Sequence, residues 1–364
     1  MADKSYSTVH YQDYLNLDRL LDCQHLRSNA PSKDPAHEEM LFIIVHQVYE
    51  LWFKQILHEV GSIIELFNTE LTDERSIGIA ESRLGRVIEI QKLLIEQIKV
   101  METMTPLDFL DFRKYLFPAS GFQSFQFRML ETMLGLENRM TYHGQSFKDA
   151  FPEDLREKLD IAESNGSLFN AIEGWLERTP FLQFSNFDFI SYYKSAVQNM
   201  ITNEEREIKA SDLLNEEQKE HRITILRNSG DHYQMILDPK KHKELRQNGE
   251  IRLSYRATLA ALLIHLYRDE PILRAPFILL VRLVEVDEYM TTWRYRHAQM
   301  VLRILGRKMG TGGSSGHKYL MGTAEKHQVF QDFHNISTLL IPRSELPPLP
   351  QTLIKELGFY FTSK

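Results

Sequence analysis

Residues 39–59 read EMLFIIVHQVYELWFKQILHE, an apolar stretch interrupted by polar residues at helical intervals. Four ring-bearing residues within it recur at i, i+4, i+7 and i+11: Phe42, His46, Tyr49 and Phe53. Residues at this spacing lie in one narrow stripe of an α-helix. The pattern therefore predicts a long helix over residues 37–67 that carries a histidine among aromatic rings.

The helical period continues along most of the chain. A second helix is expected over residues 72–100, with Thr72 as its N-cap. Further helices are expected over 106–115, from about 120 onward, and over 276–305, 323–340 and 350–361. No segment alternates like a strand and no repeat is found, so we predict an all-α, helical-bundle-like fold.

We expect residues 1–364 to form a single domain. Its middle region, about 138–250, contains charge-rich runs such as NEEREIK and NEEQKEH, which are typical of solvated helix faces. This region is therefore predicted to form smaller helices at the periphery of the larger bundle.

Composition limits the classes of function. The chain is 43% hydrophobic and 26% charged with a net charge of −7, which indicates a globular protein without a nucleic-acid partner. The lone cysteine, Cys23, excludes an intramolecular disulfide framework, a Cys-rich zinc site and c-type haem attachment. No apolar run approaches the ~20 residues of a membrane-spanning helix. We therefore expect a cytoplasmic protein that is not inserted in a membrane.

The glycine-rich stretch at 308–318, KMGTGGSSGHK, contains a G-x-S-x-G match centred on Ser314. A hydrolase nucleophile elbow needs a strand before that serine, whereas a long helix is expected here. The spacing G-x-x-x-x-G-K-[ST] of a phosphate loop is absent, and Ser315 replaces the last glycine of G-x-G-x-x-G. The stretch is interpreted as a turn-forming loop that allows close backbone approach to a ligand.

Metal sites built on helices alone are disfavoured. Di-iron bundles use Glu-x-x-His pairs, and none of the 14 histidines has a glutamate three residues before it. The stretch His37-Glu38-Glu39-Met40 is followed by leucine, where the H-E-x-x-H zinc motif requires its second histidine.

Two histidines remain as candidates, each among apolar residues on a predicted helix. His46 belongs to the first stripe, and His297 shares a face with Met290, Trp293, Val301 and Ile304. Each imidazole could be hydrogen-bonded in the core. Alternatively, the two helices could hold a flat apolar cofactor with one histidine as its iron ligand. The spacing leaves both interpretations open.

Arg113 follows Phe109 by four residues, on a face otherwise used by aromatic residues. A guanidinium placed there needs a carboxylate partner, because an unpaired buried charge costs several kcal/mol. That partner could be Asp108 or Asp111, or it could be the carboxylate of a ligand. Both interpretations stay open on spacing alone.

Four long stretches carry a resemblance to the tryptophan 2,3-dioxygenase family. They are EMLFIIVHQVYELWFKQILHE, ETMTPLDFLDFRKYLFPASGFQSFQFRMLE, WRYRHAQMVLRILG and GTGGSSGHKYL, and the similarity extends from about His10 to Leu349. The resemblance implies an all-helical, homotetrameric enzyme containing haem b. Such an enzyme uses O2 to cleave the indole C2–C3 bond of L-tryptophan, giving N-formylkynurenine.

The resemblance also implies roles for individual residues. His297 would be the proximal ligand of ferrous haem, and His46 a distal catalytic residue hydrogen-bonded to the indole N–H. Substrate binding would involve Phe42 on the indole, Arg113 on the carboxylate, Thr311 on the amino-acid end, and Tyr11 and Tyr14 from the neighbouring subunit. The haem would contact Ser120, Gly121, Phe127, Arg128, Trp293 and Tyr319, with Arg128 and Tyr319 near its propionates.

Some positions depart from the family pattern. Val45 stands where threonine is frequent, Phe125 where leucine is frequent and Arg296 where asparagine is frequent. These changes affect the expected pocket shape and leave the implied reaction class unchanged. The alternative is a helical haem-binding or haem-sensing protein without turnover, which would not need Arg113 and Thr311.

Overall fold

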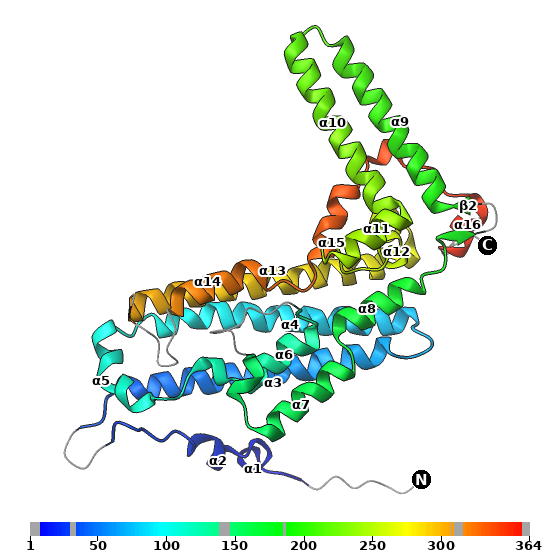
Figure 1. Ribbon diagram of the computed structural model, residues 1–364. Helices are drawn as coiled ribbons and strands as arrows, with labels where there is room; N and C mark the ends of the chain where they lie inside the picture. The colour runs from blue at the N-terminus through cyan, green and yellow to red at the C-terminus, as the bar shows by residue number, and fades with distance from the viewer. Residues whose placement is uncertain are drawn as a thin grey trace, which may run out of the picture.

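The computed structural model describes residues 8–29, 34–137, 146–184, 187–306, 308 and 316–358 (Figure 1). The α-helices are α1 (Tyr11–Leu15), α2 (Leu17–Leu21), α3 (Glu38–Phe67), α4 (Glu74–Met101), α5 (Pro106–Leu116), α6 (Phe125–Leu134), α7 (Glu153–Ser164), α8 (Leu168–Glu177), α9 (Phe189–Ala210), α10 (Glu216–Leu237), α11 (Pro239–Gln247), α12 (Tyr255–Leu266), α13 (Pro271–Leu305), α14 (Gly316–Lys326), α15 (Gln331–Asn335) and α16 (Gln351–Glu356). Short 3₁₀ helices are η1 (Gly121–Gln123), η2 (Phe147–Ala150), η3 (Ile336–Leu339) and η4 (Arg343–Glu345).

The predicted all-α class is confirmed. In the described part of the chain, the strands β1 (Gln183–Phe184) and β2 (Phe187–Asp188) form one small antiparallel pair, which the sequence did not indicate. No helix in that part combines the length and apolar character needed to cross a membrane.

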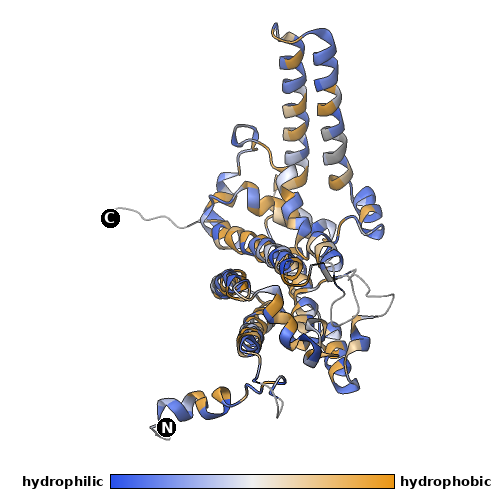
Figure 2. Ribbon diagram, turned by 90° about the vertical axis from the view of Figure 1, so that its left-hand side faces the viewer, coloured by the Kyte–Doolittle hydropathy of each residue, from blue (hydrophilic) through white to orange (hydrophobic). Residues whose placement is uncertain are grey.

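Three long helices, α3, α4 and α13, form the frame of the molecule, with α4 packed against both of the others (Figure 1). Figure 2 looks along these helices, and buried apolar residues of all three belong to one core cluster. Fully buried side chains from the three helices include Ile63, Leu84 and Leu283. Because each such side chain contributes about 1.5–3 kcal/mol, this packing dominates the stability of the frame.

Helices α3 and α4 match the ranges predicted for them, 37–67 and 72–100, closely. The N-cap residue predicted for α4 is wrong. Asp73, not Thr72, is the N-cap, because its carboxylate accepts hydrogen bonds from the backbone N–H and the hydroxyl of Ser76. Thr105 caps α5 in a capping box with Asp108. That helix places Phe109 and Phe112 in a second apolar cluster at the end of α3.

The C-terminal part differs from the prediction in several places, including α16, which ends at Glu356. The helix expected over 323–340 is divided into α14, α15 and η3. Asp287 of α13 accepts hydrogen bonds from the backbone N–H groups of Val329 and Phe330, so these donors are used in a tertiary contact at the break. In addition, α13 begins at Pro271, five residues before the expected start, and includes Pro276.

The polar middle region contains helices that are shorter than the three helices of the frame. Helices α9 and α10 contain 22 residues each and project from the body as an antiparallel hairpin (Figures 1 and 2). Tyr193 anchors the base of the hairpin, because its hydroxyl donates a hydrogen bond to the carbonyl of Leu339.

Adjacent leucines on α4 provide a test of the frame. Leu94 is 2% exposed and Leu93 is 51% exposed. Leu94→Ala should lower the free energy of unfolding by about 2–5 kcal/mol, because it leaves a cavity in the core. Leu93→Ala should cost less than about 1 kcal/mol. Urea denaturation measures both values, and equal losses would contradict the packing described.

Candidate functional site

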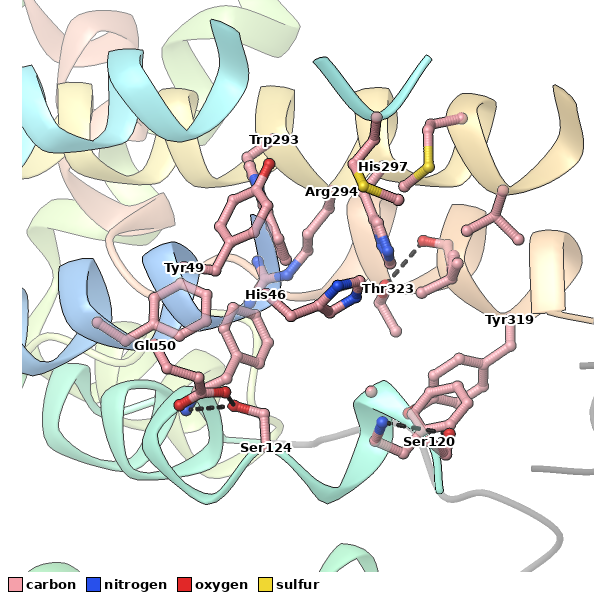
Figure 3. Close-up of a pocket in the computed structure, with 18 of the residues that line it drawn as sticks. His46, Tyr49, Glu50, Ser120, Ser124, Trp293, Arg294, His297, Tyr319 and Thr323 are labelled. Carbon is pink, nitrogen blue, oxygen red and sulfur yellow. Dashed lines mark hydrogen bonds between the residues drawn. The ribbon is translucent and has the colours of Figure 1, made fainter. Parts of the chain in front are cut away.

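A cavity of about 300 Å³ lies between α3 and α13 and is also lined by residues of η1, α6 and α14 (Figure 3). Its wall is mostly apolar and aromatic. The cavity brings together most of the site residues predicted from sequence, namely Phe42, His46, Ser120, Gly121, Phe127, Arg128, Trp293, His297 and Tyr319. Residues up to 277 positions apart along the chain therefore share one site.

Helix α3 places His46 on the cavity wall beside Phe42, with their ring centroids 4.1 Å apart. The Nδ1 of His46 lies 2.7 Å from the carbonyl oxygen of Phe42, one turn earlier. Because a carbonyl can only accept, Nδ1 carries the hydrogen and Nε2 is left as an acceptor. Burial lowers the pKa of His46, so the imidazole is neutral at pH 7.

His297 enters the cavity from α13, the opposite long helix (Figure 3). Its ring stacks on Trp293, one turn earlier, with centroids 5.3 Å apart and planes 4° from parallel. Burial, and to a smaller extent the nearby His46, lower the pKa of His297 to about 4. A neutral imidazole in an apolar wall has the form in which histidine binds a metal.

The η1 segment forms another wall of the cavity. Ser120 caps this short helix, with its hydroxyl accepting from the backbone N–H of Phe122. Glu50 of α3 joins the segment to the frame by accepting hydrogen bonds from Ser124 (2.6 Å) and Gln126 (2.8 Å). Glu50 also lines the cavity and was missed in the sequence, although it lies one turn after His46.

A buried ionic cluster borders the cavity where α6 meets α13. Glu131, 2% exposed, pairs with Arg128 at 2.8 Å and with Arg294 at 2.9 Å. Arg294 also donates to the carbonyl oxygen of His327, at 2.6 Å. Burial alone would raise the pKa of Glu131, but Arg128, a hydrogen bond from His327 and Arg294 outweigh it and hold that pKa well below its usual range.

Arg113 lies on α5, one turn after the cavity residue Phe109. Arg113 itself is not one of the described residues that line the cavity. Neither Asp108 nor Asp111 forms an ion pair with it within the part of the chain that the structure describes. Asp108 instead completes the capping box of α5 with Thr105.

The remaining predicted residues lie away from this cavity or outside the description. Tyr11 and Tyr14, on α1, are 70% and 74% exposed and are not part of this chain's cavity wall. Thr311 and Ser314 lie outside the described residues.

The arrangement suits a flat apolar group better than a bare metal ion. Within the described ranges, no cluster of three or more His, Cys, Asp or Glu side chains could hold a metal ion. An iron atom at His297 would therefore need further ligands from a cofactor. A methyl group added at Gly121 would meet no protein atom within 4 Å, so protein packing does not explain this glycine.

The lowered pKa of His297 predicts a pH dependence for the ligand-free protein. Its pKa is about 4 when folded and near 6.5 when exposed, so the unfolded chain binds more protons between these values. Stability should therefore fall as the pH is lowered from about 6.5 to 4, by up to about 3 kcal/mol from this group. Denaturant titrations of wild type and His297→Gln should show a smaller loss in the variant. Equal losses would contradict the burial of a neutral imidazole.

Comparisons with known proteins identify the family of this chain. A family model for tryptophan 2,3-dioxygenase matches residues 1–340. Relatives named tryptophan 2,3-dioxygenase include one from Bdellovibrio bacteriovorus, which is 48% identical over 98% of this chain and 99% of its own. One from Alteromonas mediterranea is 46% identical over 98% and 99%, and one from Dictyostelium discoideum is 45% identical over 98% and 90%. With the predicted residues gathered in one apolar cavity, these matches show that the chain belongs to the tryptophan 2,3-dioxygenase family.

Proposed function

We propose that this protein is a haem-dependent enzyme that inserts both atoms of O2 across the indole C2–C3 bond of L-tryptophan to give N-formylkynurenine. The observation that carries the proposal is the cavity with His46 on one long helix and His297 on the opposite one. Family membership supplies the reaction class.

The residues present fit haem b. His297 would hold the iron, because its imidazole is neutral and faces an apolar cavity. Phe127 and Trp293, whose centroids are 5.2 Å apart, would contact the macrocycle, and Ser120 and Gly121 would lie on the side of His46. When bound, ferrous haem supplies the activation of dioxygen, for which amino-acid side chains are not suited.

His46 and Phe42 would position the substrate. With Nδ1–H donated to the carbonyl of Phe42, Nε2 of His46 can accept a hydrogen bond from the indole N–H. An indole N–H is a poor acid, so this contact orients the ring and does not abstract its proton. The Phe42 ring would pack on the indole, supported by Phe109 and Phe112 at 5.9 and 5.5 Å between centroids.

The amino-acid end of tryptophan would be held by Arg113 and Thr311. A guanidinium binds a carboxylate through two parallel hydrogen bonds, and this geometry fixes the substrate as well as attracting it. Fixing both the indole and the amino-acid end brings C2 and C3 into a reactive position, and this restriction lowers the entropic part of the barrier.

We also propose a cytoplasmic homotetramer in which Tyr11 and Tyr14 enter a neighbouring subunit's pocket. Support comes from the exposed apolar side chains at the N-terminal end of the described chain, which also include Val9, just before α1, and Leu21 of α2. Single exposed apolar residues are common, but several on one short segment are typical of an interaction site. Cys23 is an exposed free thiol, in keeping with a reducing compartment.

The proposed function is tested by supplying the purified protein with haem, reducing it, and adding L-tryptophan and air. A Soret band and formation of N-formylkynurenine are expected. A protein that binds haem but forms no product would instead be a haem carrier or sensor. Absence of both signals would refute the proposal.

Two variants distinguish the substrate-binding role of Arg113 from the haem-binding role of His297. Arg113→Ala should raise KM for L-tryptophan by about 10-fold or more, because a charged hydrogen bond to the substrate is lost, and should leave the haem spectrum nearly intact. His297→Ala should lose the normal haem spectrum. Absorbance spectra and steady-state kinetics measure both effects, and a native Soret band in His297→Ala would contradict the ligand assignment.

Gly121 distinguishes ligand contact from protein packing. Gly121→Ala should change the free energy of unfolding of the ligand-free protein by less than about 1 kcal/mol, because its added methyl meets no protein atom. It should nevertheless weaken binding of haem or L-tryptophan. Gly135→Ala is the matched control: a Cβ there would lie 2.5 Å from the Ser167 hydroxyl at φ +102°, so it should destabilise the fold. Unchanged ligand binding in Gly121→Ala would contradict the contact.

A further inference from the structure

A second cavity, of about 340 Å³, lies at the base of the hairpin formed by α9 and α10. Helices α10, α11, α12 and α15 meet there (Figure 1), and η3 completes the wall. The wall is mostly apolar and includes the buried side chains of Ile236, Leu253 and Leu339. Its volume lies within the range of small-molecule sites, about 300–1,000 Å³. None of its lining residues belongs to the first cavity.

The ionised groups in the wall of this second cavity are acids. Asp332 and Glu250 line it, and no lysine, arginine or histidine does so among the described residues. Asp332 is only 7% exposed, and its Oδ2 accepts hydrogen bonds from the backbone N–H groups of Arg252 (2.7 Å) and Leu253 (2.6 Å). Its Oδ1 has no hydrogen-bond or ion-pair partner in the part of the chain that the structure describes. One carboxylate oxygen is therefore open to a ligand.

The cations nearest to Asp332 do not neutralise it. The guanidinium of Arg252 pairs with Glu137, at 3.0 Å, and does not line the cavity. Burial, and then the nearby Arg246, lower the pKa of His242, and Asp332 does not offset them, so this imidazole is neutral at pH 7. A carboxylate without a cation in a largely apolar wall is stabilised by a ligand that brings a positive charge.

The rest of the wall restricts the kind of cation. No aromatic ring lines the cavity within the described ranges, so a quaternary ammonium group would find no cation–π contact. The carboxylates and the hydroxyl oxygen of Thr338 instead accept hydrogen bonds from N–H groups. An amino acid would fit poorly, because its own carboxylate would face Asp332 and Glu250 without a cation. This chemistry favours a protonated primary amine on an apolar body.

We propose that the second cavity is a binding site for a small primary amine whose ammonium group donates to Oδ1 of Asp332. The apolar body of this amine packs on Ile236, Leu253 and Leu339. Glu250, which is exposed, adds a weaker attraction. The site goes beyond the proposed function, since it uses neither the haem nor the residues of the first cavity.

The test is a calorimetric titration of the purified protein with 2-phenylethylamine. Two matched ligands are titrated in parallel: 2-phenylethanol, which lacks the charge, and L-phenylalanine, which adds a carboxylate. The amine should bind at one site per chain and about 10-fold or more tightly than either of them, because only it gains the charged hydrogen bond without repulsion. Absence of amine binding, or equal affinities for the three ligands, would overturn the inference.

Asp332→Asn removes the charge and keeps an oxygen that can accept from the backbone N–H groups of Arg252 and Leu253. It should weaken amine binding by about 10-fold or more. Asp287→Asn is the matched control, because Asp287 is also a buried acid that accepts from two backbone N–H groups but lines neither cavity. This control should keep the affinity of the wild type.

Glu250→Gln keeps the test decisive if Asp332→Asn does not fold. Glu250 is exposed and accepts one hydrogen bond, from Asn248 at 3.3 Å, so the variant should fold normally. It should weaken amine binding by about 2- to 5-fold. Wild-type affinity in a folded Asp332→Asn, or in Glu250→Gln where Asp332→Asn is unfolded, would overturn the inference.

A final titration establishes which cavity the amine occupies. It uses ferric, haem-loaded protein saturated with L-tryptophan, the ligand proposed for the first cavity. Amine affinity should be unchanged, because the two cavities share no residue. Competition between the two ligands would assign the amine to the first cavity and overturn the inference. A protein that binds neither haem nor tryptophan would refute the proposed function and leave the results with Asp332→Asn and Glu250→Gln standing.

Discussion

The carboxylate of Glu131 is a constraint on which much of this molecule depends. It is buried, and it stays ionised only because Arg128, Arg294 and His327 surround it. These partners come from α6, from α13 and from the segment after α14, so one side chain fixes the relative positions of three distant parts of the chain. The cavity has its shape because these parts cannot separate without exposing a buried charge network to disruption.

The histidines of the cavity depend on a different effect. Desolvation keeps His46 and His297 neutral, and helical geometry decides which nitrogen of His46 faces the cavity. Both residues stand on long helices packed against α4. A site built on such elements holds its groups in position before any ligand arrives, which reduces the reorganisation that binding or reaction requires.

The helical spacing of apolar residues was sufficient to predict α3, α4 and the all-α class, because the buried face of each helix consists of apolar residues at that spacing. Local capping was less certain, since Thr72 and Asp73 are adjacent and both residue types cap helices. The break after α14 depends on Asp287, which lies 42 residues earlier, so no local pattern reveals it. Glu131 was missed because an Arg–Glu pair at i, i+3 looks the same on a solvated face as in a core.

The cavity between α3 and α13 also makes the stability of the folded chain depend on the concentration of its ligand. When no ligand fills this space of about 300 Å³, the apolar side chains that line it stay in contact with water. Any occupant that binds the folded chain alone shifts the folding equilibrium by mass action. Cellular quality control acts on the unfolded fraction. The amount of this protein that a cell maintains should therefore follow the supply of the occupant, even at a constant rate of synthesis.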